Sequence, residues 1–135
     1  MKRKILNDLI NWKNSLERKP LILKGARQIG KTYILKEFGN LYYDNVAYFN
    51  FDYSTDLHSL FETNKDPYRI IEQLTFINKE AIKEEKTLII FDEIQECSNA
   101  LNTLKYFTEL APKFHIVCAG SLLGIKLSNT SFPVR

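Results

Sequence analysis

The chain has 135 residues, of which 44% are hydrophobic and 26% are charged, and its formal net charge is +3 at pH 7. This composition is typical of one soluble globular domain. No apolar run approaches the roughly 18 residues of a membrane helix, and Asn7, Asp8 and Asn11 interrupt the only candidate for a secretion signal. Cys97 and Cys118 lack metal-ligand spacing with either histidine, which indicates reduced thiols and a cytoplasmic protein.

The first 19 residues predict an amphipathic helix that packs on the rest of the domain. Ile5, Leu9, Trp12 and Leu16 recur at helical spacing, and Pro20 marks the exit. The basic residues of this region fit either a solvated helix face or a patch for nucleic acid or a partner. No ladder of aromatic and basic residues accompanies them, so support for nucleic acid is weak.

Apolar runs that alternate with helical stretches predict an α/β sheet of parallel strands. The predicted strands cover residues 21–24, 46–51, 87–93 and 114–121. The predicted helices cover residues 31–38 with Gly39 as the stop, 57–62, a segment opened by Asp66 and Pro67 with Ile70, Ile71, Leu74 and Ile77 on one face, and a segment capped by Ser98 that stops near Pro112.

The stretch GARQIGKT, residues 25–32, lies between the first predicted strand and the helix that follows it. A glycine, four free positions and then Gly-Lys-Thr form the pattern of a loop that cradles phosphates. Gly25 and Gly30 let backbone N–H groups turn toward an anion, Lys31 supplies charge to the β and γ phosphates, and the Thr32 hydroxyl ligates Mg²⁺. The residues predicted to bind the nucleotide are Gly25, Ala26, Arg27, Gln28, Ile29, Gly30, Lys31, Thr32 and Tyr33.

Two carboxylates, Asp92 and Glu93, end the third predicted strand. Ligands of parallel α/β folds bind at the carboxyl ends of the strands, so Asp92 is predicted to hold Mg²⁺ opposite Thr32. A second acid near the γ phosphate can orient and deprotonate a water molecule, which is the role predicted for Glu93. The alternative is a pair that merely ends a strand in solvent.

Other polar residues at the same edge leave alternatives open. Ser121 could contact the γ phosphate or the attacking water, or cap the segment that follows it. Asn50 could hold the Glu93 carboxylate away from water until a partner binds, or act as a turn residue. Arg27 and Gln28 face either solvent or a neighbouring subunit. The predicted catalytic residues are Lys31, Asn50, Glu93 and Ser121.

The segments RKPLILKGARQIGKT, YFNFD, LIIFDEIQ, LKYF and AGSLLG, in this order, resemble the AAA+ ATPase domain of a set of prokaryotic P-loop ATPases that carry a further C-terminal domain. The resemblance implies that residues 1–135 are one partial ATP-binding core of the P-loop NTPase fold, in three α/β/α layers with a parallel sheet of about four strands. It also implies that residues 25–32 are the Walker A loop, that Asp92 and Glu93 are Walker B, and that Ser121 occupies the sensor 1 position. ATP and Mg²⁺ are the implied ligands.

The chain ends in SFPVR, where the resemblance implies a fifth strand, a helical lid and the C-terminal domain. We therefore expect a fragment that binds ATP weakly and hydrolyses it slowly. Residues 21–23 are expected to form an exposed apolar edge that a second copy or a protein partner covers. The competing functions are an inactive nucleotide-binding remnant or interaction module, and a small-molecule kinase, for which the sequence shows no acceptor site.

Overall fold

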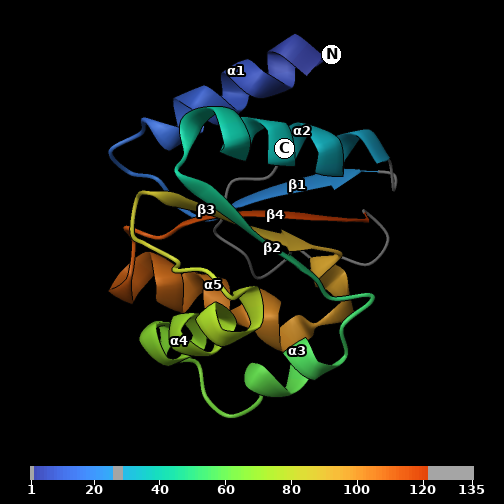
Figure 1. The fold of residues 1–135 in the computed structure, drawn as a ribbon, viewed down its shortest axis with the longest axis vertical. Helices are drawn as coiled ribbons and strands as arrows, with labels where there is room; N and C mark the ends of the chain where they lie inside the picture. The colour runs from blue at the N-terminus through green and yellow to red at the C-terminus, as the bar shows by residue number, and fades with distance from the viewer. Residues whose placement is uncertain (1, 26–28, 122–135) are drawn as a thin grey trace.

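The computed structural model describes residues 2–25 and 29–121, which form three α/β/α layers around one parallel sheet (Figure 1). The strands lie in the order β1-β4-β3-β2, and their bounds are Leu21–Gly25 (β1), Asn45–Asn50 (β2), Thr87–Asp92 (β3) and His115–Ser121 (β4). One face is covered by α1 (Lys2–Lys13) and α2 (Ile29–Tyr42), and the other by α3 (Asp56–Leu60), α4 (Pro67–Asn78) and α5 (Ser98–Leu110). A short 3₁₀ helix, η1 (Ile94–Glu96), follows β3. The predicted fold class is confirmed.

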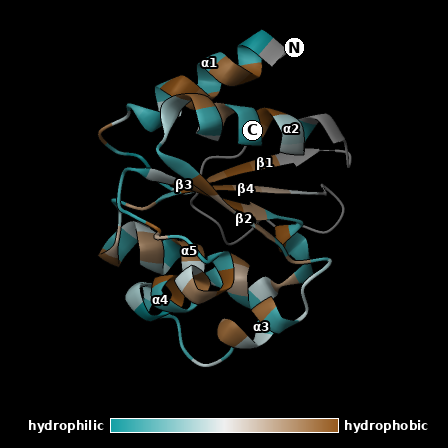
Figure 2. Ribbon diagram, in the orientation of Figure 1, coloured by the Kyte–Doolittle hydropathy of each residue, from teal (hydrophilic) through white to brown (hydrophobic). Residues whose placement is uncertain are grey.

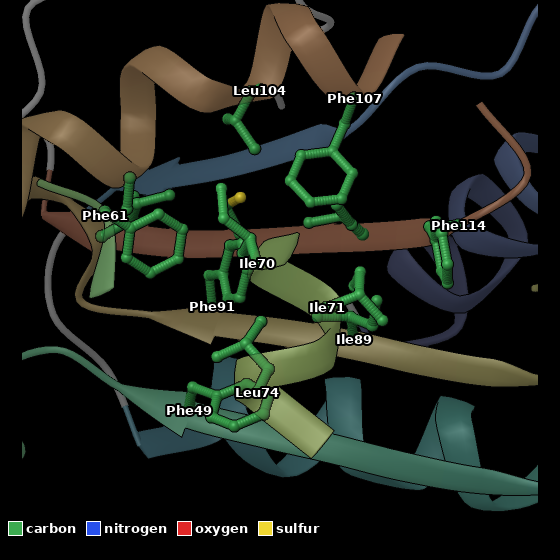
Figure 3. Packing of buried hydrophobic residues seen from close by; sticks show 14 of the residues in the cluster. Phe49, Phe61, Ile70, Ile71, Leu74, Ile89, Phe91, Leu104, Phe107 and Phe114 are labelled. Carbon is green, nitrogen blue, oxygen red and sulfur yellow. The ribbon is translucent and has the colours of Figure 1, made fainter. Parts of the chain in front are cut away.

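The middle strand β3 is buried along its whole length, as its apolar run predicts. Leu88 and Ile90 join the core beneath α1 and α2, whereas Ile89 and Phe91 join the core beneath α3, α4 and α5. In the core beneath α3, α4 and α5, Phe91 packs among Ile70 and Leu74 of α4 and Leu104 and Phe107 of α5 (Figure 3). The strands are accordingly the most apolar part of the ribbon, between helices of mixed character (Figure 2).

The first helix is shorter than its predicted stripe. Leu9 and Trp12 are buried against the sheet layer, but α1 ends at Lys13 and Leu16 is fully exposed. The Trp12 indole N–H donates to the carbonyl of Lys19 at 2.6 Å, which holds the returning chain against the end of the helix. The helical period therefore stops one turn earlier than the sequence suggested.

The prediction that Gly39 stops the second helix is wrong. Helix α2 begins at Ile29 and continues to Tyr42, so Gly39 lies inside it. A Cβ at this position would lie 2.3 Å from Cγ2 of Val46 and 3.1 Å from Cδ2 of Leu88. Glycine is required here because α2 approaches β2 and β3 too closely for a side chain.

The layer on the other face agrees with the sequence in part. The Asp66 carboxylate accepts the N–H of Tyr68 at 3.1 Å, so the predicted cap of α4 is confirmed. Ile77, predicted to face the core, is 48% exposed because the buried stripe of α4 ends at Leu74. Ser98 is the first residue of α5 rather than its cap, a position that Cys97 occupies.

Strand β1 pairs with β4 alone within the described part of the chain. The prediction that residues 21–23 form an exposed apolar edge is wrong for the side chains, because Leu21, Ile22 and Leu23 are 1%, 0% and 7% exposed. They alternate between the two cores on the two faces of the sheet. Over the described ranges, no helix has the length and apolar character needed to cross a membrane.

Candidate nucleotide-binding site

The parallel register brings the predicted site residues to one edge of the sheet. Asn50 of β2 pairs with Asp92 of β3, and Asp92 pairs with Ala119 of β4. Gly25, which ends β1, pairs with Ser121 at the end of β4. The strands thus end together where ligands of open parallel sheets bind.

Asp92 meets the first turns of α2. Leu88 and Ile90 face α2, and because side chains alternate along a strand, Asp92 faces the same way. The Thr32 hydroxyl donates to Oδ2 of Asp92 at 2.9 Å, although the two residues are 60 positions apart in the sequence. Asp92 is only 7% exposed. The structure therefore brings together the two residues that the sequence assigned to Mg²⁺.

Two further donors hold the Asp92 carboxylate. The Tyr48 hydroxyl donates to Oδ2 at 2.5 Å, and the N–H of Glu93 donates to Oδ1 at 3.0 Å. Burial, followed by the bond to Asp92, raises the pKa of Tyr48 to about 12. Sequence reasoning missed Tyr48, which reads as an ordinary strand aromatic. The signal was its position two residues before Asn50, on the side of β2 that faces Asp92.

Glu93 leaves the strand in an unusual backbone conformation. Its φ of 55° and ψ of 45° lie in the left-handed region, and it precedes η1. This region costs a residue with a side chain roughly 1–2 kcal/mol, and such strain clusters at functional sites. The Gln95 side chain donates to Oε1 of Glu93 at 2.7 Å. Gln95 is therefore a second site residue that the sequence analysis did not single out.

Lys31 lies at the same end of α2, near Glu93. Burial lowers the pKa of Lys31, and the negative charge of Glu93 raises it in opposition. The cation and the second carboxylate are thus close enough to influence each other. Lys31 and Glu93 are far apart in the sequence. The packing of α2 on β3, which also joins Thr32 to Asp92, brings them near each other.

The predicted contact between Asn50 and Glu93 is not formed. The Asn50 amide nitrogen donates to the Tyr48 hydroxyl at 3.2 Å. Its carbonyl oxygen accepts the N–H groups of Asp52 at 2.8 Å and Tyr53 at 3.2 Å. Asn50 thus acts as a turn residue, which was the alternative role, and it is also linked to Asp92 through Tyr48.

Part of the predicted site lies outside the described residues. Ala26, Arg27 and Gln28 are among these, as are residues 122–135, which include the segment that Ser121 was expected to cap. The side chains of Ile29 and Ser121 are likewise not described, although the backbone of Gly25, Ile29, Gly30 and Ser121 belongs to β1, α2 and β4. Tyr33, in the first turns of α2, is 60% exposed.

The donor set at this edge is small. Within residues 2–25 and 29–121, no three or more His, Cys, Asp or Glu side chains gather in a way that could hold a metal ion. His58 bonds the carbonyl of Phe51 at 3.0 Å, and His115 bonds the Tyr43 hydroxyl at 2.6 Å. Both histidines therefore have structural partners away from Asp92.

Comparison with known proteins identifies the domain. The solved structure of PCH-2 from C. elegans is similar with a TM-score of 0.56 and 14% sequence identity, over 96% of this chain and 38% of the PCH-2 chain. At this identity the likeness shows the fold alone. No curated protein sequence matches the chain significantly. The family model described as AAA domain matches residues 17–134, so the chain belongs to the AAA domain family, a family of nucleotide-binding, ATPase-type P-loop domains.

Proposed function

We propose that this chain binds ATP with Mg²⁺ and hydrolyses it to ADP and phosphate. The observation that carries the proposal is the 2.9 Å bond between Thr32 and Asp92 at the carboxyl edge of the sheet, with Glu93 directly after it. In this reading residues 25–32 form the phosphate loop, Walker A, and Asp92 and Glu93 form Walker B. The proposal extends to residues 1–135 as one ATP-binding core.

The residues present fit Mg²⁺. Thr32 and Asp92 offer a hydroxyl and a carboxylate oxygen, which are hard ligands of the kind that this cation takes. Mg²⁺ in nucleotide sites needs only one or two protein ligands, because water and phosphate oxygens complete its shell. Thr32 and Asp92 are therefore sufficient as protein ligands for such a centre.

Each charged residue then has a separate role. Lys31, at the start of α2, would place its ammonium on the β and γ phosphates. Bound Mg²⁺ would neutralise charge on the same phosphates. Glu93 would orient a water molecule and accept its proton, since it follows Asp92 directly and its charge acts on Lys31. Ser121 is proposed as a contact of the γ phosphate or of that water.

A second candidate is a module that binds nucleotide without hydrolysing it. The observation in its favour is the bond from Gln95 to Oε1 of Glu93, which engages one oxygen of the proposed base. A carboxylate with one oxygen occupied is less free to take a proton from water. In this case nucleotide binding would be intact while turnover would be absent.

One experiment separates the two candidates. Equilibrium binding of a fluorescent ATP analogue and single-turnover hydrolysis of radiolabelled ATP are measured on the same preparation, with Lys31→Ala as the control. Binding and turnover that both disappear in the control support hydrolysis. Binding without turnover supports the module, and no binding at all overturns both.

We also propose a location and partners for the protein. Both cysteines are buried free thiols, which supports the cytoplasm as the compartment. Strand β1 carries one described partner strand, which supports a second copy or another protein beside it. Contact with nucleic acid rests on the basic residues near the N-terminus alone.

A further inference from the structure

We propose that Tyr48 is a positioning residue for the metal-binding carboxylate, because its hydroxyl fixes the orientation of Asp92 beside the Thr32 hydroxyl proposed to ligate the cation. The inference rests on the proposed function of the site. It assigns a role to a residue that the sequence pattern of phosphate loop and strand-end acids does not include.

The Asp92 carboxylate accepts hydrogen bonds at both of its oxygens. Thr32 and Tyr48 donate to the same oxygen, Oδ2, at 2.9 Å and 2.5 Å, while the Glu93 N–H donates to Oδ1 at 3.0 Å. A hydroxyl that ligates a cation does so through an oxygen lone pair and keeps its O–H, so Thr32 can retain its bond to Asp92 when the metal binds. Tyr48 gives Oδ2 a second donor, and together with the Glu93 N–H at Oδ1 it fixes the carboxylate at both oxygens.

The direction of the Tyr48 proton follows from the partners of Asn50. The Asn50 carbonyl oxygen is identified by the N–H groups of Asp52 and Tyr53 that it accepts, at 2.8 Å and 3.2 Å. The Asn50 nitrogen is therefore the atom that faces Tyr48, and it donates to the phenolic oxygen at 3.2 Å. Because an amide N–H₂ cannot accept, the single hydroxyl proton of Tyr48 is directed to Asp92.

The ring of Tyr48 is held on the α2 face of the sheet. Tyr48 pairs in register with Ile90, so its side chain lies on the α2 face of the sheet, as does that of Asp92. The Lys36 ammonium lies 4.0 Å from the centre of the Tyr48 ring. Lys36 is one helical turn after Thr32, so one face of α2 contacts both the ring and the carboxylate.

A purely structural role of Tyr48 predicts a different result. If Tyr48 only stabilised the fold, Tyr48→Phe would lower the melting temperature and weaken nucleotide binding equally with and without metal. A positioning role instead changes the dependence on Mg²⁺. Removing a partner of a metal ligand typically lowers metal affinity on the order of 10-fold to 100-fold.

The test is a pair of titrations with a fluorescent ATP analogue, one with increasing Mg²⁺ and one in EDTA. For Tyr48→Phe we expect the Mg²⁺ concentration at half saturation to rise about 10-fold, while affinity in EDTA stays near that of the wild type. Tyr43→Phe is the matched control, since it also removes a bonded hydroxyl, one that contacts His115 at 2.6 Å. It should leave the Mg²⁺ dependence unchanged.

A second substitution tests whether Tyr48 acts through Asp92. In an Asp92→Asn background, Tyr48→Phe should add no further change in Mg²⁺ dependence, because the ligand that it positions is already altered. An unchanged Mg²⁺ titration in Tyr48→Phe alone, or an additional loss in the double variant, overturns the inference. A wild-type chain that binds no ATP under either condition overturns the proposed function and the inference with it.

If Tyr48→Phe does not fold, the wild type provides another readout. The chain has 7 tyrosines, and ¹³C labelling of their ring carbons gives each a signal in the spectrum of the complex. Adding Mg²⁺ to the ATP complex should shift the signal of the half-buried Tyr48, and Asp92→Asn should abolish that shift. A set of tyrosine signals that does not respond to Mg²⁺ contradicts the inference.

Discussion

Gly39→Ala tests how closely α2 is held against the sheet. In a helix interior, alanine is more favourable than glycine by about 1 kcal/mol. Against this gain, the new methyl group would lie 2.3 Å from Cγ2 of Val46 and 3.1 Å from Cδ2 of Leu88. Val46 is β-branched and stiff at χ1, and Leu88 is fully buried, so neither neighbour yields easily.

The expected result is a net loss of stability. Overpacking of this kind costs about 1–3 kcal/mol, and the helical gain of about 1 kcal/mol offsets part of it, which leaves up to about 2 kcal/mol of destabilisation. Any outward shift of α2 would also move Thr32 relative to Asp92, so the Mg²⁺ concentration needed for ATP binding should rise.

Urea unfolding followed by circular dichroism measures the effect. The matched control is Asn40→Ala, at the next and exposed position of the same helix, which should stabilise the chain by about 0.5 kcal/mol. A Gly39→Ala chain more stable than the wild type would refute the reasoning, because helix propensity would then outweigh the contacts with Val46 and Leu88.

Three further predictions concern charged and titrating groups. Lys31→Ala should abolish the binding of Mg–ATP that calorimetry measures, since it removes the cation proposed to bind the phosphates. Unchanged affinity in a folded variant would show that residues 25–32 are not the phosphate-binding loop. Glu93→Gln should keep ATP binding and lower single-turnover hydrolysis on the order of 10² to 10⁴-fold. Asp92→Asn should instead weaken the Mg²⁺ dependence of binding. Identical behaviour of the two variants would contradict their separate roles. Burial lowers the pKa of His115 to about 3, below its ordinary value of 6.5, so the unfolded chain binds the proton more tightly and stability should fall as the pH drops from 6.5 toward 3. Urea unfolding at pH 7 and pH 5 should show a smaller loss for His115→Leu than for the wild type, and equal losses would show that this histidine does not contribute.

The sequence by itself predicted the strands, the chemical character of the loop, and the two acids Asp92, which ends β3, and Glu93, which follows it. These features are local. An apolar run between polar segments must be buried, and the spacing of Gly, Lys and Thr restricts what the backbone at residues 25–32 can bind. The cap at Asp66 was predictable for the same reason, since it depends on an oxygen two residues before the N–H that it accepts.

Tertiary structure decided which residues meet at the sheet edge. Gly39 looks like a helix stop in sequence, and only the approach of α2 to Val46 and Leu88 shows why it lies within the helix. Tyr48 acquires its partner Asp92 from the register of β2 on β3, which no local pattern encodes. A hydrogen bond such as that from Thr32 to Asp92 joins segments 60 residues apart, so its geometry exists only after the sheet and α2 have packed together.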